Sequence, residues 1–220
     1  MIPSKKIIRI ISDLEIRFGI PIRAEKTDAL SCLIKTILSQ NTNDRNRDMA
    51  YYNLTHSFPT WESILNADLT DVITAIRSAG LANQKGRYIK DILKWIQDSY
   101  SELNIDFICT METKKAIALF VQQKGIGIKT ISVVMMIACN KDVFPVDTHV
   151  HRLCKRLELV PQTADAVRTH YLMQNLIPPG KSFSLHMNLL KLGRTICTAR
   201  KPDHVSCPLN TICPSRFKIF

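Results

Sequence analysis

Apolar residues recur at helical spacing along most of this sequence, and no stretch alternates apolar and polar residues as a half-buried β-strand would. The clearest set falls on one face of a single helix and comprises Leu30, Leu33, Ile34, Ile37 and Leu38. Because period-two signals are missing, the sequence predicts an all-α protein.

Capping residues and apolar spacing locate the predicted helices. Asp28 stands before the 30–38 helix as its N-cap. The other predicted helices are an amphipathic one within residues 1–18, two short ones capped by Thr60 and Thr70, one from about 84 to 100, one before Gly125, and one over 130–139. Gly80 is expected to end the second short helix. The 130–139 segment is apolar nearly all round, which is typical of a buried helix.

The size and composition suit a globular chain. With 220 residues and 45% apolar content, one or two domains with a sizeable core are expected. The longest unbroken apolar run, around residues 133–139, is too short to cross a bilayer. Charged residues interrupt the apolar pattern of residues 1–18, which excludes a secretory signal. We therefore expect a soluble chain that stays in the cytoplasm near the nucleoid.

The charge is strongly basic. Thirty Lys and Arg residues against 19 Asp and Glu residues give a formal net charge of +11. Such an excess favours polyanionic partners, such as nucleic acid or acidic lipid, although a general role in solubility is the alternative.

The seven cysteines fall into two groups. Four lie singly in apolar stretches and are predicted to be buried free thiols of a reducing compartment: Cys32, Cys109, Cys139 and Cys154. The other three crowd the C-terminal segment: Cys197, Cys207 and Cys213.

The segment from Lys124 to Lys129 lies between two predicted helices and contains Gly125 and Gly127. Two such glycines permit positive φ angles and the close approach of another molecule to the backbone. The amide groups that begin the second helix could then hold a phosphate. A plain tight turn is the alternative for a glycine pair alone.

Two residues near this turn could carry chemistry. Lys129 stands at the start of the buried helix, where loss of solvation would lower its pKa and leave a nucleophilic amine. Asp147 follows eighteen residues later and can cap the next helix, where its carboxylate is held ionised. A solvated lysine and a purely structural cap are the alternatives.

The segments Gly-Ile-Gly-Ile-Lys-Thr and Val-Asp-Thr-His-Val-His-Arg resemble the helix-hairpin-helix and catalytic aspartate segments of endonuclease III, and the match extends from Leu30 to Pro214. The resemblance implies two helical lobes, residues 30–141 and residues 1–29 with 142–220, with DNA in the cleft between them. It implies that Lys129 attacks C1′ of a damaged nucleotide, forms a Schiff base and permits β-elimination, while Asp147 assists departure of the base. Related adenine-mismatch glycosylases lack this lysine, so a bifunctional glycosylase and AP lyase is expected, with oxidised pyrimidines as substrates.

The resemblance also implies contacts with DNA. Gln40 or Asn41 would fill the gap left by an extruded nucleotide, and both remain open. Leu81 would wedge between bases. Asp44 would lie near the lesion pocket, and the phosphate contacts would come from Lys85, Arg87 and Lys90 and from Gly125 and Gly127 in the hairpin. Two further groups are implied: His149 and Arg152, which would support the helix of Asp147 or touch the DNA backbone, and Arg194, Arg200 and Lys201 in a basic loop. Solvated surface residues are the alternative for the last two groups.

The family holds a four-iron four-sulfur (4Fe–4S) cluster with the pattern Cys-x₆-Cys-x₂-Cys-x₅-Cys. This sequence keeps the spacing with Cys197, His204, Cys207 and Cys213, so a histidine stands in the second position. A cluster with His204 as its fourth ligand is expected, with a raised reduction potential and greater lability. Zinc bound by the same four residues, or no metal, are the alternatives.

Two other functions remain open. One is a mismatch glycosylase that removes uracil or thymine opposite guanine, and the other is a non-catalytic protein that binds DNA damage. In each case the expected partner is double-stranded DNA with a damaged base or an abasic site, bound by a monomer away from membranes.

Overall fold

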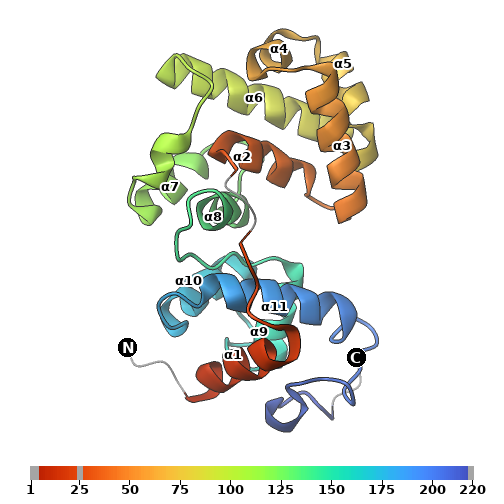
Figure 1. Ribbon diagram of the computed structural model, residues 1–220, viewed down its shortest axis with the longest axis vertical. Coiled ribbons are helices and arrows are strands. Elements are labelled where there is room, and N and C mark those ends of the chain that lie inside the picture. The colour runs from red at the N-terminus through yellow and green to blue at the C-terminus, as the bar shows by residue number, and fades with distance from the viewer. Residues whose placement is uncertain (1–4, 24–26, 218–220) are drawn as a thin grey trace. The chain divides into compact units, whose positions relative to one another are not determined.

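The computed structural model describes residues 5–23 and 27–217 (Figure 1). All regular secondary structure in these ranges is helical, so the all-α prediction is confirmed. The described residues divide into two compact units, one of residues 27–141 and the other of residues 5–23 with 142–217. The predicted boundary at residue 30 falls inside the first of these units, at the start of its first helix.

The unit of residues 27–141 is built around two apolar helices, α2 and α8, that pack against each other (Figure 1). In chain order its helices are α2 (Ala29–Leu38), α3 (Asp44–Ser57), α4 (Trp61–Asn66), α5 (Leu69–Ala75), η1 (Arg77–Ala79), α6 (Ala82–Tyr100), η2 (Asp106–Cys109), α7 (Thr113–Phe120) and α8 (Ile128–Ile137). Most of α2 and α8 is buried, as the all-round apolar pattern of residues 130–139 predicted.

The predicted caps are mostly confirmed. The Asp28 carboxylate accepts from the amide of Ser31 at 2.7 Å, and Thr60 forms a capping box with Ser63. The prediction for Thr70 is wrong, because α5 begins at Leu69 and its N-cap is Asp68. The helix starts earlier because Leu69 shares the helical spacing of the buried residues that follow it.

The second unit packs the C-terminal helix α11 against α1 and α9. Its helices are α1 (Lys5–Phe18), α9 (Thr148–Arg156), α10 (Ala166–Leu176), α11 (Ser182–Thr195) and η3 (Asn210–Ile212). Gly193 permits a close crossing of α11 and α9, since a Cβ there would lie 3.1 Å from the Cβ of His149 and 3.2 Å from Leu153 Cδ1. This crossing places the chain after α11 beside α9.

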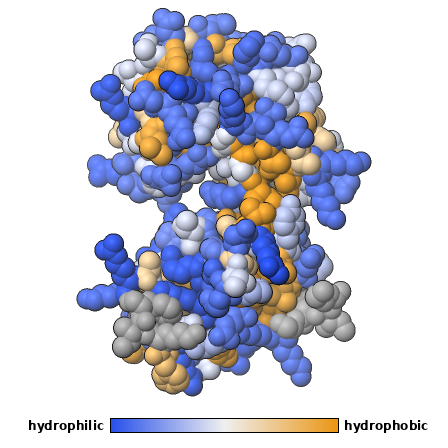
Figure 2. Space-filling model, turned by 180° about the vertical axis from the view of Figure 1, so that it is seen from behind, coloured by the Kyte–Doolittle hydropathy of each residue, from blue (hydrophilic) through white to orange (hydrophobic). Residues whose placement is uncertain are grey.

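Hydrophilic residues cover most of the face seen in Figure 2, and apolar residues show through as smaller patches. Within the described ranges, no helix is both long and apolar enough to span a membrane.

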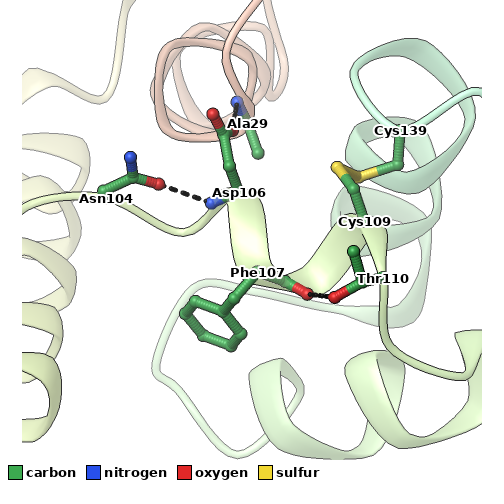
Figure 3. Close-up of a disulfide and its surroundings, with 7 residues drawn as sticks. All are labelled: Ala29, Asn104, Asp106, Phe107, Cys109, Thr110 and Cys139. Carbon is green, nitrogen blue, oxygen red and sulfur yellow. Dashed lines mark hydrogen bonds between the residues drawn. A yellow bond between two sulfur atoms is a disulfide. The ribbon is translucent and has the colours of Figure 1, made fainter.

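Two of the four cysteines predicted to be free thiols form a disulfide. Cys109 at the end of η2 is bonded to Cys139 just after α8, with their Cα atoms 4.7 Å apart (Figure 3). Cys32 and Cys154 are free and buried, as predicted. The prediction failed for Cys109 and Cys139 because the spacing within each segment does not reveal that η2 ends beside the end of α8.

The short helix η2 is also bonded to the start of α2. The Asp106 carboxylate accepts from the amide of Ala29 at 2.9 Å, and Asn104 in turn accepts from the amide of Asp106 (Figure 3). One short element therefore holds the first residue of α2 and the last turn of α8. The disulfide closes a covalent loop, residues 109–139, that contains α7 and the whole of α8.

We predict that the double substitution Cys109→Ser and Cys139→Ser lowers the free energy of unfolding by about 3 to 4 kcal/mol. The reason is that closing a loop of this length removes conformational entropy from the unfolded chain. Thermal and denaturant unfolding of the oxidised wild type, with and without a phosphine reductant, checks this. The double variant should not respond to the reductant, and a wild type that is equally stable in both conditions would contradict the prediction.

Candidate functional site

The turn between α7 and α8 contains one glycine at a position where a side chain would strain the backbone and displace a neighbour. Gly125 has a φ of +81°, and a Cβ at this position would lie 2.2 Å from the ring of Tyr88. Gly127 differs, because its φ is −88° and a Cβ there would meet nothing within 4 Å. The expected positive φ is thus right for Gly125 and wrong for Gly127, which is the exposed N-cap of α8.

Side chains from two other helices hold this turn in place. The Gln40 side chain, just after α2, donates from Nε2 to the carbonyl of Gly125 at 2.9 Å. The Tyr88 ring of α6 lies against Gly125, and its hydroxyl accepts from Gln84 at 2.8 Å. The hairpin is therefore fixed to α2 and α6 before any ligand binds.

Lys129 is the second residue of α8 and is half-buried. It lies in the first helical turn, which Gly127 closes by accepting from the amides of Thr130 and Ile131. This places the lysine at the point where the hairpin becomes the buried helix, as the sequence predicted.

Asp147 belongs to the other unit and is the N-cap of α9. Its Oδ1 accepts from the amide of Val150 at 2.8 Å. The residue is half-buried and directly follows a buried apolar segment, residues 143–146. The prediction that Asp147 caps a helix is confirmed, and the cap bond fixes the orientation of the carboxylate. It does not exclude a chemical role, since the cap bond uses one of the two carboxylate oxygens.

The residues proposed to support Asp147 are engaged in the packing of α9. Arg152 donates from Nη2 to the carbonyls of Gly193 and Cys197, both at 2.9 Å, and lies 3.3 Å from Nδ1 of His149. Of the two alternatives for Arg152, support of the helix is what the geometry shows. The arginine ties α9 to the end of α11.

Two exposed residues of the first unit adopt an uncommon backbone conformation. Asn41, after α2, and Leu81, before α6, have φ angles of +50° and +49°. Leu81 is 52% exposed, and a left-handed conformation of a non-glycine residue costs about 1 to 3 kcal/mol. Asn41 is exposed, whereas the amide of the adjacent Gln40 is bonded to the hairpin.

The prediction that Lys85 contacts phosphate is wrong. Its side chain is 1% exposed, and Nζ donates to the carbonyls of Leu38 and Ala79, each at 2.8 Å. Burial lowers the pKa of Lys85 to about 8. The sequence did contain the signal, because Lys85 precedes the buried Ile89 and Ile92 at helical spacing and so belongs to the apolar face of α6.

The neighbouring basic residues of α6 behave differently from each other. Lys90 is half-buried and donates to carbonyls at the end of α4, among them that of Ile64 at 3.3 Å. These bonds direct its amine to the protein backbone, so the predicted phosphate contact of Lys90 is not supported. Arg87 is exposed, as a phosphate contact requires.

Asp44 lies on the surface, as do three basic residues in the last turn of α11 and in the loop after it. Asp44 is the first residue of α3 and pairs with Arg47 at 2.7 Å. Arg194, Arg200 and Lys201 are exposed.

The four candidate metal ligands line one pocket in the C-terminal segment. The pocket is lined by Cys197, His204, Cys207 and Cys213 together with Arg156. Within the described part of the chain, no three candidate ligands converge on a single point as an ion would require. The four residues nonetheless share one pocket, as the ligands of a cluster do.

The chemistry of the ligands fits a cluster as well. The His204 ring is bonded through Nδ1 to the carbonyl of Arg216. Because a carbonyl only accepts, Nδ1 carries the hydrogen and Nε2 keeps the lone pair that a metal needs. Burial raises the pKa of the Cys207 thiol to about 11, so this sulfur depends on a cation to become a thiolate.

Sequence reasoning missed Arg156, which organises the start of this segment. The residue is 7% exposed and donates to Cys197 Sγ at 3.2 Å, to the carbonyl of Thr198 at 2.7 Å and to that of Ala199 at 2.8 Å. Its guanidinium supplies positive charge beside a sulfur that would be a thiolate in a cluster. The available signal was its position one helical turn after Arg152 on α9.

Comparison with known proteins agrees with this arrangement. Residues 34–179 match the HhH-GPD superfamily of base excision DNA repair proteins, and residues 197–213 match the iron–sulfur binding domain of endonuclease III. The chain is 31% identical over 194 residues to endonuclease III of Sulfolobus acidocaldarius, which covers 84% of this chain and 82% of that one. A protein from Arabidopsis thaliana that carries the name DNA glycosylase is 34% identical over 177 residues, and this chain spans 60% of its length.

Among solved structures, an endonuclease III trapped as a covalent intermediate with DNA shares the fold, with a TM-score of 0.83 and 24% identity over 97% of both chains. The two sequence matches include the hairpin and the cysteine segment. This chain therefore belongs to the HhH-GPD superfamily and is a base excision repair DNA glycosylase of the endonuclease III family.

Proposed function

We propose that this glycosylase is bifunctional: it removes an oxidised pyrimidine from duplex DNA and then cleaves the strand through a Schiff base on Lys129. The observation that carries the proposal is the position of Lys129. It lies in the first turn of α8, directly after a hairpin whose backbone is fixed by Gly125 and open at Gly127. A glycosylase that only hydrolyses the bond between the base and the sugar has no need of an amine there.

The chemistry follows from an amine and a carboxylate. The lone pair of Lys129 Nζ forms a bond to C1′ as the glycosidic bond breaks and the base departs with its electron pair. Nζ then loses a proton, and its lone pair opens the sugar ring: the C1′–O4′ bond breaks, O4′ takes up a proton, and a protonated imine joins Nζ to C1′. Loss of a proton from C2′ to solvent forms a C2′–C3′ double bond, and the 3′ phosphate leaves as the C3′–O bond breaks. The Asp147 carboxylate, held by the amide of Val150, would stabilise the positive charge that develops on the sugar.

DNA must be distorted for this attack, since C1′ of a stacked nucleotide is shielded. In the proposal Asn41 fills the space of the extruded nucleotide, and Leu81 wedges between neighbouring bases. Their exposure and left-handed backbone support these roles, and the engagement of Gln40 with Gly125 favours Asn41 as the plug. Asp44 is proposed to lie near the lesion.

The phosphate contacts would come from the hairpin backbone and exposed basic residues. Gly127 is open to another molecule, and Arg87, Arg194, Arg200 and Lys201 are exposed. With a net charge of +11, binding should weaken steeply with salt.

We further propose that His204 is the fourth ligand of a 4Fe–4S cluster held with Cys197, Cys207 and Cys213. The supporting observations are the shared pocket and the Nδ1 bond that leaves Nε2 for the metal. When bound, the cluster would act as a structural cross-link of a segment with little core of its own. The exposed Arg200 and Lys201 lie in the loop that it would order.

We predict that Lys129→Gln abolishes covalent trapping by borohydride and slows strand cleavage by at least ~10³-fold, because no other residue replaces the nucleophile. Wild type and variant are incubated with duplexes containing thymine glycol, uracil or thymine opposite guanine, or an abasic site. Lys124→Gln, an exposed lysine in the same hairpin, is the matched control and should trap like the wild type.

A wild type that is folded and binds these duplexes but forms no trapped complex would overturn the lyase assignment. Base removal without trapping, seen only on the uracil or thymine mismatches, would instead establish the mismatch glycosylase. Binding without removal of any base would establish the damage-binding protein.

We predict that His204→Ala lowers the iron and sulfide content per chain, because one ligand is lost. His204→Cys should retain the cluster with a lower reduction potential, because thiolate adds negative charge at the metal. Metal analysis and protein-film voltammetry measure both quantities. Unchanged iron content and potential in both variants would show that His204 is not a ligand, and one zinc per chain would refute the cluster.

A further inference from the structure

Two loops of the 27–141 unit carry the residues proposed to enter DNA. The Asn41 loop comprises residues 39–43, after α2, and the Leu81 loop comprises residues 79–82, between η1 and α6. Each contains one non-glycine residue with a positive φ angle, +50° at Asn41 and +49° at Leu81. Such a conformation is unfavourable for a leucine and persists where the surroundings enforce it, whereas asparagine adopts it more readily.

The buried side chain of Lys85 is bonded to the chain beside both loops. Its Nζ donates to the carbonyl of Leu38, the last residue of α2, and to the carbonyl of Ala79, the last residue of η1, each at 2.8 Å. Leu38 directly precedes the Asn41 loop, and Ala79 begins the Leu81 loop. The two acceptors are 41 residues apart in sequence, so the lysine joins two helix ends that are distant along the chain.

Helix ends explain why a cation occupies this position. The last carbonyls of a helix lack intrahelical donors and form its negative end, so an ammonium group satisfies them and is stabilised by them. The position is otherwise apolar, because Lys85 shares the buried face of α6 with Ile89 and Ile92. A methionine would fill such a space without the cost of burying an amine. The bonds to the two carbonyls are what only the lysine supplies.

The hairpin is connected to the same set of contacts. Gln40, in the Asn41 loop, donates to the carbonyl of Gly125, and the ring of Tyr88 lies against Gly125. Tyr88 follows Lys85 by three residues on α6. One helix thus supports the hairpin with Tyr88 and both loops with Lys85.

We infer that Lys85 is a positioning residue that holds the Asn41 loop and the Leu81 loop in fixed register, so that both side chains enter the duplex in one step when the nucleotide is extruded. Lys85 itself touches no DNA. The inference rests on the proposed function, in which Asn41 and Leu81 occupy the distorted duplex.

The test compares Lys85→Met with Lys90→Met. Lys90 lies on the same helix and also donates to backbone carbonyls, but those carbonyls belong to the end of α4 rather than to either loop. It is therefore a control for the general loss of a helix-end contact. Nucleotide extrusion is followed by the fluorescence of 2-aminopurine beside an abasic-site analogue, and base excision by single-turnover kinetics.

Lys85→Met should slow extrusion and excision about 10- to 100-fold, the cost of a small misplacement of positioned groups, without weakening binding to undamaged duplex. Lys90→Met should behave like the wild type in all three measurements. Equal losses in the two variants, or a folded Lys85→Met that extrudes like the wild type, would overturn the inference.

A double-mutant cycle separates positioning from stability. Leu81→Ala should slow extrusion in the wild-type and Lys90→Met backgrounds, but add little in the Lys85→Met background, where Leu81 is already out of register. Additive losses in the Lys85→Met background would mean that Lys85 acts independently of Leu81 and would reject the inference.

Should Lys85→Met unfold at the assay temperature, Lys85→Gln replaces it, since the shorter amide keeps an N–H donor for one of the carbonyls. The same readouts then apply. One bond cannot hold both loops, so Lys85→Gln should still slow extrusion, and a folded Lys85→Gln that extrudes like the wild type would overturn the inference. Failure of the proposed function is distinguishable, because it shows in the wild type itself, which then extrudes no nucleotide or forms no trapped complex. Failure of this inference alone leaves wild-type extrusion intact.

Discussion

Basic side chains that donate to backbone carbonyls hold the functional segments of both units in place. In the first unit Lys85 binds the carbonyls that end α2 and η1. In the second unit Arg152 and Arg156 bind carbonyls in the last turn of α11 and just after it. The common reason is that the end of a helix leaves carbonyl groups without donors, and a cation satisfies several at once. Loops that would otherwise be loosely attached are thereby fixed to helices.

This use of charge changes how the basic composition is understood. Part of the +11 charge is engaged in hydrogen bonds inside the protein and is not available to a polyanion, as at Lys85, Arg156 and, in large part, Lys90. The remaining exposed charge, including Arg194 and Arg200, is what a DNA backbone could meet. Net charge therefore indicated the right class of partner without indicating which residues would contact it.

The fold was predictable because helical spacing and capping are local properties. The 30–38 helix, its Asp28 cap and the buried α8 all follow from residues close together in the sequence. The hairpin and its lysine were found from a short motif. What failed depends on contacts between distant segments: the bond between Cys109 and Cys139 requires knowing where η2 ends.

The predictions for the candidate site also succeeded where they depended on neighbouring residues and failed where they depended on distant segments. Asp147 was correctly expected to cap a helix, because the cap bond spans three residues. Lys85 was misassigned because a lysine near a wedge-like leucine suggests phosphate contact, whereas the direction of its side chain is set by the apolar face of α6. Arg156 was missed because its acceptors come from a segment about forty residues further along the chain.

The covalent loop between Cys109 and Cys139 has a consequence for how the hairpin can move. Both ends of the segment that holds α7, Gly125 and Lys129 are tied at one point, so the hairpin cannot peel away from the unit as a free arm. Local unfolding of the hairpin must therefore displace a closed loop of chain rather than a segment with one free end. A protease cut anywhere inside that ring would leave two pieces still joined as a single molecule, with the amine carried on one and its supporting glycine able to remain beside it.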